Sequence, residues 1–159
     1  MIGRSADQYK DGAFTWFTGK VENINDPKKL NRVKVRCFGF YDDIAVADLP
    51  WATVMMPVTS ASMKGNGGNH HLEVGSWVVG FFRDGPSAQD PMVMGSIATQ
   101  TDGTQDIPTE SSVDNKVYKS KAGHLIEIDN TDGSEKIKIT HGKTNSFIEF
   151  TSTGKIRIV

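Results

Sequence analysis

Residues 32–38 read Arg-Val-Lys-Val-Arg-Cys-Phe, a strict alternation of basic and apolar side chains. Successive side chains on a β-strand point to opposite faces, so the two valines and the cysteine share one face and the basic residues share the other. Upstream, Asn25-Asp26-Pro27 interrupts the preceding apolar run, because proline fixes φ and lacks an N–H donor. The stretch therefore predicts a half-buried strand, paired in a hairpin with a strand over residues 14–24.

Three further runs in the first hundred residues have strand character. Residues 51–58, 75–83 and 92–97 are rich in β-branched and aromatic side chains, and Gly-, Pro- and Asn-containing turns separate them. The run 75–83 is apolar on both faces, which is typical of a central strand, and Gly80 within it predicts a bend or bulge. Five short strands without a long helix favour a small closed barrel, such as the five-stranded OB type, because closure removes exposed sheet edges.

A different repeat occupies residues 116–159, where four apolar-x-apolar pairs are separated by turns containing Gly, Asp or Asn. Alternation places both members of each pair on one face of short strands, in an antiparallel or winding arrangement. A stable domain needs two packed layers, and nothing else in the chain can cover this face. We therefore expect copies of the chain to cover it, with a closed trimeric prism as the simplest solution. The predicted trimer-interface residues are Ile126, Ile128, Ile137, Ile139, Ile148, Phe150, Ile156 and Ile158.

These patterns divide an all-β chain into four segments. Residues 1–12 are a polar N-terminal arm, 13–97 the barrel, 98–115 an almost wholly polar linker and 116–159 the prism strands. The apolar-polar alternation continues up to Val159 without a tip motif, which predicts either a very short needle or a longer natural chain.

Composition argues against several classes of function. The formal net charge is -1, so the basic excess that neutralises a nucleic-acid backbone is missing. Cys37 is the only cysteine, which rules out an intramolecular disulfide and suggests a small buried apolar residue. The N-terminus is polar, unlike a signal peptide, and no apolar run approaches the roughly 18 residues of a membrane helix.

Candidate catalytic and metal-binding residues form no recognisable constellation. The acidic residues fall in predicted loops, and the adjacent His70 and His71 would point to opposite faces of a strand, so neither an enzyme nor a bound cofactor or metal is expected. His124 and His141 lie near strand ends, where a trimer could bring their copies together on its axis. The loop Lys64–Asn69 lacks the ending of a phosphate-binding loop. Within it, Gly65, Asn66, Gly67 and Gly68 are predicted to form a hub contact or a loop ordered by a neighbouring protein.

Ten aromatic residues in the barrel region could in principle stack on a ligand: Phe14, Trp16, Phe17, Phe38, Phe40, Tyr41, Trp51, Trp77, Phe81 and Phe82. Core packing is expected for roughly three in four of them. The alternative is an OB-type binding module for a glycan or single-stranded nucleic acid, which would use exposed aromatics beside the basic face of residues 32–36.

Several of these runs resemble the barrel of T4-like phage baseplate central spikes, the tail-lysozyme spike family. They are WFTGKVE at residues 16–22, DPKKLNRVKVR at 26–36, LPWATVMMPVTSA at 49–61 and VGSWVVGFF at 74–82. The sequence GHLIEID at 123–129 is similar to the start of the β-helical needle in phage spikes and in type VI secretion VgrG proteins.

The resemblance implies an OB-fold that docks on a separate ring-shaped hub, followed by a trimeric, intertwined β-helix that pierces the host envelope. The implied partners are two further copies of the chain, a hub protein, a spike-tip protein and, transiently, the envelope. The implied location is the tail baseplate of the virion, after assembly in the host cytoplasm. In the T4 spike a lysozyme domain separates barrel and needle, but residues 98–115 are too few for one, so a non-enzymatic role is expected. A spike of a bacterial contractile injection system is an alternative.

Overall fold

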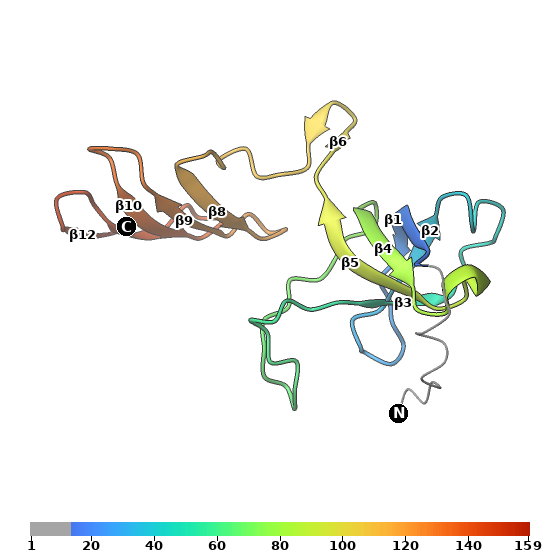
Figure 1. Ribbon diagram of the computed structural model, residues 1–159. Coiled ribbons are helices and arrows are strands. Elements are labelled where there is room, and N and C mark those ends of the chain that lie inside the picture. Colours follow the sequence, from blue (N-terminus) through green and yellow to red (C-terminus); the bar gives the residue numbers. More distant parts are fainter. Residues whose placement is uncertain (1–13) are drawn as a thin grey trace. The chain divides into compact units, whose positions relative to one another are not determined.

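The computed structural model describes residues 14–159 and contains two compact units, divided between Ile97 and Ala98 (Figure 1). The expected arm at residues 1–12 lies outside the described residues. Both units consist of β-strands, and a single 3₁₀ turn, η1 (Gly85–Ser87), is the one helical element in the described part of the chain. The predicted all-β class is therefore confirmed.

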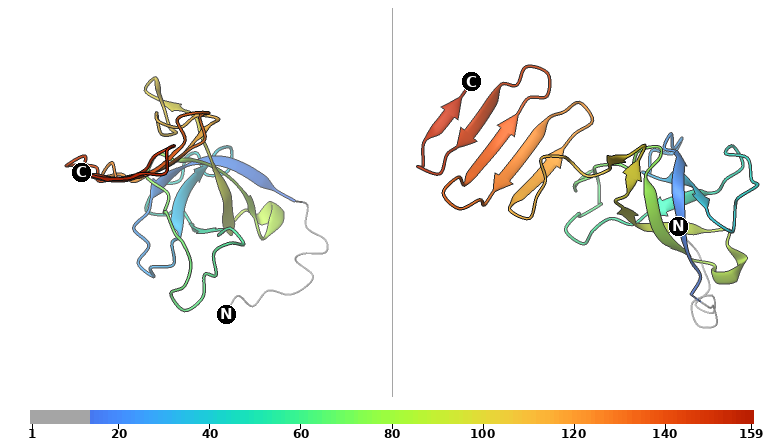
Figure 2. Two further views of the ribbon diagram at one scale, coloured as in Figure 1. Left: turned by 90° about the vertical axis from the view of Figure 1, so that its left-hand side faces the viewer. Right: turned by 90° about the horizontal axis from the view of Figure 1, so that it is seen from above.

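The first unit is a closed five-stranded barrel. Its strands are β1 (Trp16–Asn23), β2 (Val33–Cys37), β3 (Trp51–Val54), β4 (Trp77–Phe82) and β5 (Pro91–Ile97). They close in the order β1-β2-β3-β5-β4, and all neighbours are antiparallel except β3 and β5, which run parallel (Figures 1 and 2). Strand β3 ends at Val54, earlier than the predicted run 51–58, and Pro57 within that run has no N–H to donate to a ladder.

The apolar side chains that the alternation of residues 32–38 places on one face point into the barrel interior. Val33, Val35 and Cys37 are fully buried, and Phe17 packs against Phe82 with ring centroids 4.9 Å apart. Burial raises the pKa of the Cys37 thiol to about 12, so the thiol stays protonated at neutral pH. Cys37 is thus a buried apolar residue, as predicted, and not an activated nucleophile.

Gly80 lies where the β4–β5 ladder is irregular, as predicted for this glycine. Val79 pairs with Gly95 and Gly80 pairs with Val93, so the extra residue of the bulge is Met94 on β5. A Cβ at position 80 would overlap the carbonyl oxygen of Met92 and lie 2.6 Å from Cζ of Phe17. Only a residue without a side chain allows β5 and the Phe17 ring to approach this closely.

The prediction for the aromatic residues was wrong. Of the ten, only Phe17, Tyr41 and Phe82 are buried, whereas Phe14 and Trp16 are more than half exposed. A five-stranded barrel has a narrow interior, and neighbours such as Trp16 and Phe17 must point to opposite sides of their strand. Several aromatics therefore lie on the outer surface in pairs, among them Phe14 with Phe81 (ring centroids 5.5 Å apart) and Phe38 with Trp77 (5.2 Å).

The β1–β2 connection is organised around the carboxylate of Asp26. This side chain accepts hydrogen bonds from the backbone N–H groups of Lys28, Leu30 and Arg32 and from the Arg32 guanidinium, with a shortest N–O distance of 2.6 Å. The Arg32 guanidinium, together with these N–H donors, holds the pKa of Asp26 well below its ordinary value.

Replacing Asp26 with Asn should weaken the acid dependence of barrel stability. Because the folded-state pKa is depressed, the carboxylate stabilises the barrel above its unfolded pKa of about 4, and this contribution is lost as pH falls below that value. Denaturant melts followed by tryptophan fluorescence at pH 7 and pH 3 report on the barrel, since all three tryptophans belong to it. D26N should be less stable than wild type at pH 7 and should lose less on acidification. The exposed Asp48→Asn is the control, and an equal acid loss in D26N and wild type would contradict the role of Asp26.

The second unit contains a five-stranded antiparallel meander. Its strands are β8 (Asn115–Lys119), β9 (Leu125–Asp129), β10 (Lys136–Thr140), β11 (Phe147–Phe150) and β12 (Ile156–Ile158), in the order β12-β11-β10-β9-β8 (Figure 2). An antiparallel or a winding arrangement was predicted for this region, and within a single chain the arrangement is antiparallel. Sequence analysis missed β8, because it carries no apolar-x-apolar pair and shows strand character only at Val117 and Tyr118.

The segment 98–115 was predicted as a linker, but much of it is structured. It contains a small hairpin of β6 (Gln100–Thr101) and β7 (Thr104–Gln105), closed by hydrogen bonds from Thr99 to the Asp106 carboxylate. Its last residues belong to the edge of the sheet, where Asn130 donates its backbone N–H to Asp114 and Asn115 begins β8. Polar composition was misleading, because side-chain oxygens of Ser, Thr and Asp satisfy backbone N–H groups in such turns.

Candidate functional site

The two faces of the C-terminal sheet differ sharply, and the apolar face is the candidate site. Strand register aligns the eight predicted residues in two parallel rows that cross the sheet. One row contains Ile126, Ile139, Ile148 and Ile158, and the other contains Ile128, Ile137, Phe150 and Ile156. On β8, Tyr118 continues the first row and Lys116 the second. The structure therefore brings all eight predicted residues together and adds Tyr118.

In a single chain this apolar face is open to solvent. Its eight residues are between 41% and 75% exposed. Among the described residues, the buried apolar cluster lies entirely between Phe17 and Val93, within the barrel. The sheet thus has one layer and no apolar core of its own, whereas an ordinary domain packs two layers together. A contiguous apolar face of this kind marks an interaction surface.

The opposite face carries a ladder of alternating charges. Register aligns Glu127, Lys138, Glu149 and Arg157 across four adjacent strands. Arg157 donates to Glu149 at 3.0 Å, and the ring of Phe147 lies beneath the Lys138 ammonium, 4.4 Å from its centroid. Glu127 and Glu149 are largely covered by their neighbours, at 9% and 8% exposed, and opposite charges on facing positions stabilise a sheet. The polarity of the two faces therefore defines an outside and an inside for any assembly.

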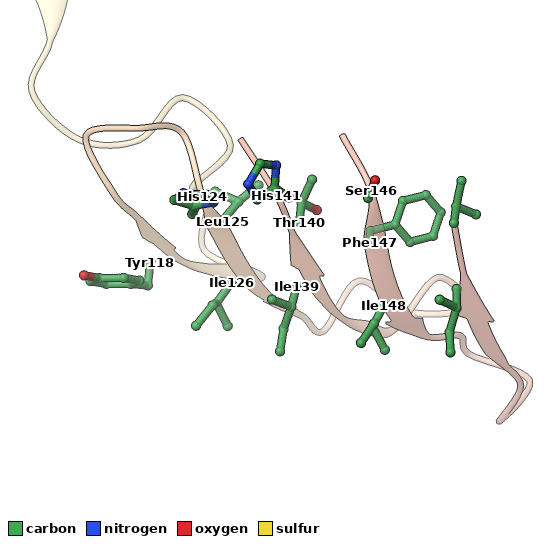
Figure 3. A pocket seen from close by; sticks show the side chains of 12 residues that line it. Tyr118, His124, Leu125, Ile126, Ile139, Thr140, His141, Ser146, Phe147 and Ile148 are labelled. Carbon is green, nitrogen blue, oxygen red and sulfur yellow. The ribbon is translucent and has the colours of Figure 1, made fainter. Parts of the chain in front are cut away.

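At one end of the apolar face lies a groove of about 520 Å³ (Figure 3). Ile126, Ile139 and Ile148 project from one side of the sheet, while His124 and His141 lie near the turn end of their strands. The groove wall is almost entirely apolar apart from the two imidazoles and small hydroxyl groups. It offers no catalytic pair of acid and base with a positioned nucleophile.

The basic face of β2 does not form the groove that nucleic-acid binding would need. Arg32 is held by Asp26, and Arg36 is held by Glu22 at 2.6 Å. Lys34 is buried and donates its ammonium protons to the carbonyl oxygens of residues 46 and 47. These three cations stabilise loops of the barrel itself, so the basic side of residues 32–36 is structural.

The glycine-rich loop is exposed and closed by its own backbone. Met63 and Asn66 exchange two backbone hydrogen bonds of 3.3 and 2.9 Å, which form a tight turn around Lys64 and Gly65. Gly67 has a positive φ of 132°, and a Cβ there would lie 2.5 Å from Oγ of Ser60. The loop is therefore ordered by contacts within the chain, and its predicted contact with a hub remains a prediction.

His70 and His71 are exposed, and within residues 14–159 no three His, Cys, Asp or Glu side chains are grouped so that they could hold a metal ion. In the same range, no helix has the length and apolar character of a bilayer-spanning segment.

The closed barrel, with strands of mixed direction and a core built from alternate residues, makes the first unit an OB-fold domain. The family model described as the Gp5 N-terminal OB domain matches residues 34–154, and the chain belongs to this family.

Two curated relatives are phage proteins. The chain is 41% identical over 92 residues to protein Gp5 of Vibrio phage KVP40, an alignment that covers 52% of this chain and 21% of the relative. It is 42% identical over 79 residues to the pre-baseplate central spike protein Gp5 of Enterobacteria phage T4, covering 43% of this chain and 14% of the relative. The chain thus spans between a seventh and about a fifth of the length of these relatives.

Proposed function

We propose that this chain is a structural part of the central spike of a phage-type contractile tail, located in the virion baseplate and acting as a homotrimer. The similarity to a T4 central spike protein supports the spike role. The observation that carries the trimer is the single-layer sheet, whose apolar rows have no cover within the chain.

Three copies of the sheet would form the walls of a prism. The apolar rows would face the axis, where the three sheets bury each other, and the charge ladder would face water. Strands β9, β10 and β11 already pair on both sides within one chain. Only the outer edges of β8 and β12 therefore remain for pairing with copies, and cyclic closure would leave neither edge exposed. Such a prism is a stiff rod suited to transmitting the force of contraction.

In this proposal the barrel docks on a separate hub protein, and the prism leads into the part of the spike that penetrates the host envelope. A spike-tip protein would complete the rod. The barrel needs no copy of itself to fold, because its core is complete within one chain. Its outward aromatic pairs and its glycine-rich loop are therefore free to contact another protein. The role is mechanical and not enzymatic.

The solution mass of the purified chain tests the proposal. Light scattering should give three times the chain mass of 17.4 kDa. A well-folded monomer would contradict the trimer and bring forward the second candidate, an OB-type binding module. The exposed aromatic pairs favour a glycan over a single-stranded nucleic acid as the ligand of that module, because the neighbouring cations are held within the barrel. Binding on a glycan array would then distinguish the module from an inert monomer.

A further inference from the structure

Two histidines lie side by side in neighbouring turns at the end of the apolar face. His124 directly precedes β9, and His141 directly follows β10. Their ring centroids are 4.6 Å apart, the ring planes make an angle of 61°, and both rings line the groove (Figure 3). The exposed pair is thus placed where two turns of the sheet come together.

A backbone N–H points at Nδ1 of each ring. The N–H of Gly142 donates to Nδ1 of His124 at 3.2 Å, and the N–H of Thr144 donates to Nδ1 of His141 at 3.3 Å. A backbone N–H can only donate, so Nδ1 of His124 must present a lone pair and its neutral ring carries the proton on Nε2. Nδ1 of His141 also lies 3.0 Å from Oγ1 of Thr144, which can donate to this nitrogen or accept from it. A metal-binding histidine differs, because its ring nitrogen that does not bind the metal donates a proton to an oxygen, whereas Nδ1 of His124 accepts one from a backbone N–H.

The hydrogen bond of His124 joins two tightly packed turns. One turn is closed by the Ser120 N–H, which donates to the carbonyl oxygen of His124 at 2.9 Å, and the other by the His141 N–H, which donates to Ser146 at 2.8 Å. A Cβ on Gly142 would overlap the carbonyl oxygen of Ala122, so the two backbones are in direct contact. The imidazole of His124 therefore connects the start of β9 to the turn that follows β10.

We propose that His124 and His141 form a pH-sensitive clamp, which fastens these two turns at neutral pH and releases them when the rings are protonated. A second proton on His124 must bind Nδ1, where the backbone N–H of Gly142 already points, so protonation breaks the hydrogen bond that joins the two turns. Two cationic rings at this separation also repel each other. The clamp therefore stabilises the turns at neutral pH, and its contribution is lost as pH falls.

The residues that line the groove show which titratable side chains lie beside the two rings. Tyr118 from β8 is the other titratable side chain lining the groove, and no carboxylate side chain is among the residues that line it. The two turns themselves carry the cations Lys121 and Lys143. The carboxylates of Glu127 and Glu149 alternate with the apolar rows and so belong to the opposite face.

Amide hydrogen exchange of the full chain tests the clamp, because the Gly142 N–H donates directly to His124. Protection factors, corrected for intrinsic exchange, are measured at about pH 7.5 and about pH 5.5. In wild type, the Gly142 amide should lose about tenfold in protection on acidification. The variant His124→Asn/His141→Asn places a non-titrating oxygen acceptor near each Nδ1 and should keep similar protection at both pH values. The control His70→Asn/His71→Asn removes the other two histidines and should respond like wild type.

Wild-type protection that changes less than twofold would overturn the proposal, and so would an acid loss in the His124/His141 double variant as large as that of wild type. Nitrogen chemical shifts of the wild-type rings give a second test that needs no variant. For His124 they should show an unprotonated Nδ1 at about pH 7.5, and the Gly142 amide shift should follow the titration of this ring. A protonated Nδ1 at neutral pH would equally overturn the clamp. The bonds that these measurements follow lie within one chain, whereas the solution mass decides the trimer, so the two proposals are tested by different readouts.

Discussion

Ile139→Asp is expected to abolish trimer formation and to unfold the C-terminal sheet while leaving the barrel folded. Ile139 lies on the central strand β10, flanked in its row by Ile126 and Ile148. In the proposed prism, three carboxylates at this position would meet near one axis without counter-charges. Burying an unpaired charge costs several kcal/mol for each chain, more than a marginal sheet can tolerate.

The measurement is the mass of the variant by light scattering, together with tryptophan fluorescence, which reports on the barrel alone. We expect a single-chain mass and an unchanged barrel spectrum. Ser152→Asp adds the same charge in the exposed turn between β11 and β12 and should remain trimeric. In a sheet whose apolar face stays in water, Ile139→Asp would cost only about 1 kcal/mol of strand preference. A folded, trimeric I139D would therefore exclude the prism.

Gly80→Ala is expected to destabilise the barrel by about 2 kcal/mol. The added methyl group would overlap the carbonyl oxygen of Met92 and approach Cζ of Phe17 to 2.6 Å. Main-chain atoms of a closed barrel cannot move aside without breaking the β4–β5 ladder, and the ring of Phe17 is held by Phe82. Overpacking of this kind forces backbone shifts in a densely packed interior.

Gly95→Ala is the matched control for Gly80→Ala. Gly95 is on β5 opposite Val79, in the same ladder, but a Cβ there would have no neighbour within 4 Å, and its φ is not positive. This substitution should be neutral or stabilising by a few tenths of a kcal/mol, because alanine restricts the unfolded chain. Urea melts followed by tryptophan fluorescence compare the two variants. Equal midpoints would mean that the bulge can accommodate a side chain and that close approach does not require Gly80.

The alternation of residues 32–38 was enough to predict β2, its buried face and the hairpin with β1. Period-2 patterns determine which residues share a face, because strand geometry does not depend on the rest of the fold. The same local rule placed all eight apolar residues of the C-terminal sheet on one face. The position of Gly80 could also be predicted, since glycine within an apolar strand is typical of a bulge.

The sequence by itself thus determined the five barrel strands, four strands of the C-terminal sheet, their faces and the unpartnered apolar rows of this protein. Only the tertiary structure decided what each outward side chain contacts. Arg32, Lys34 and Arg36 resembled a binding face, but their partners come from the β1–β2 connection, from β1 and from the segment that follows β2. Trp16 lies outside the barrel because a small closed sheet has room for only one of its two faces. His124 meets Gly142 because β9 and β10 pair in one register. Such contacts depend on closure and register, which bring distant residues together and leave no trace in local periodicity.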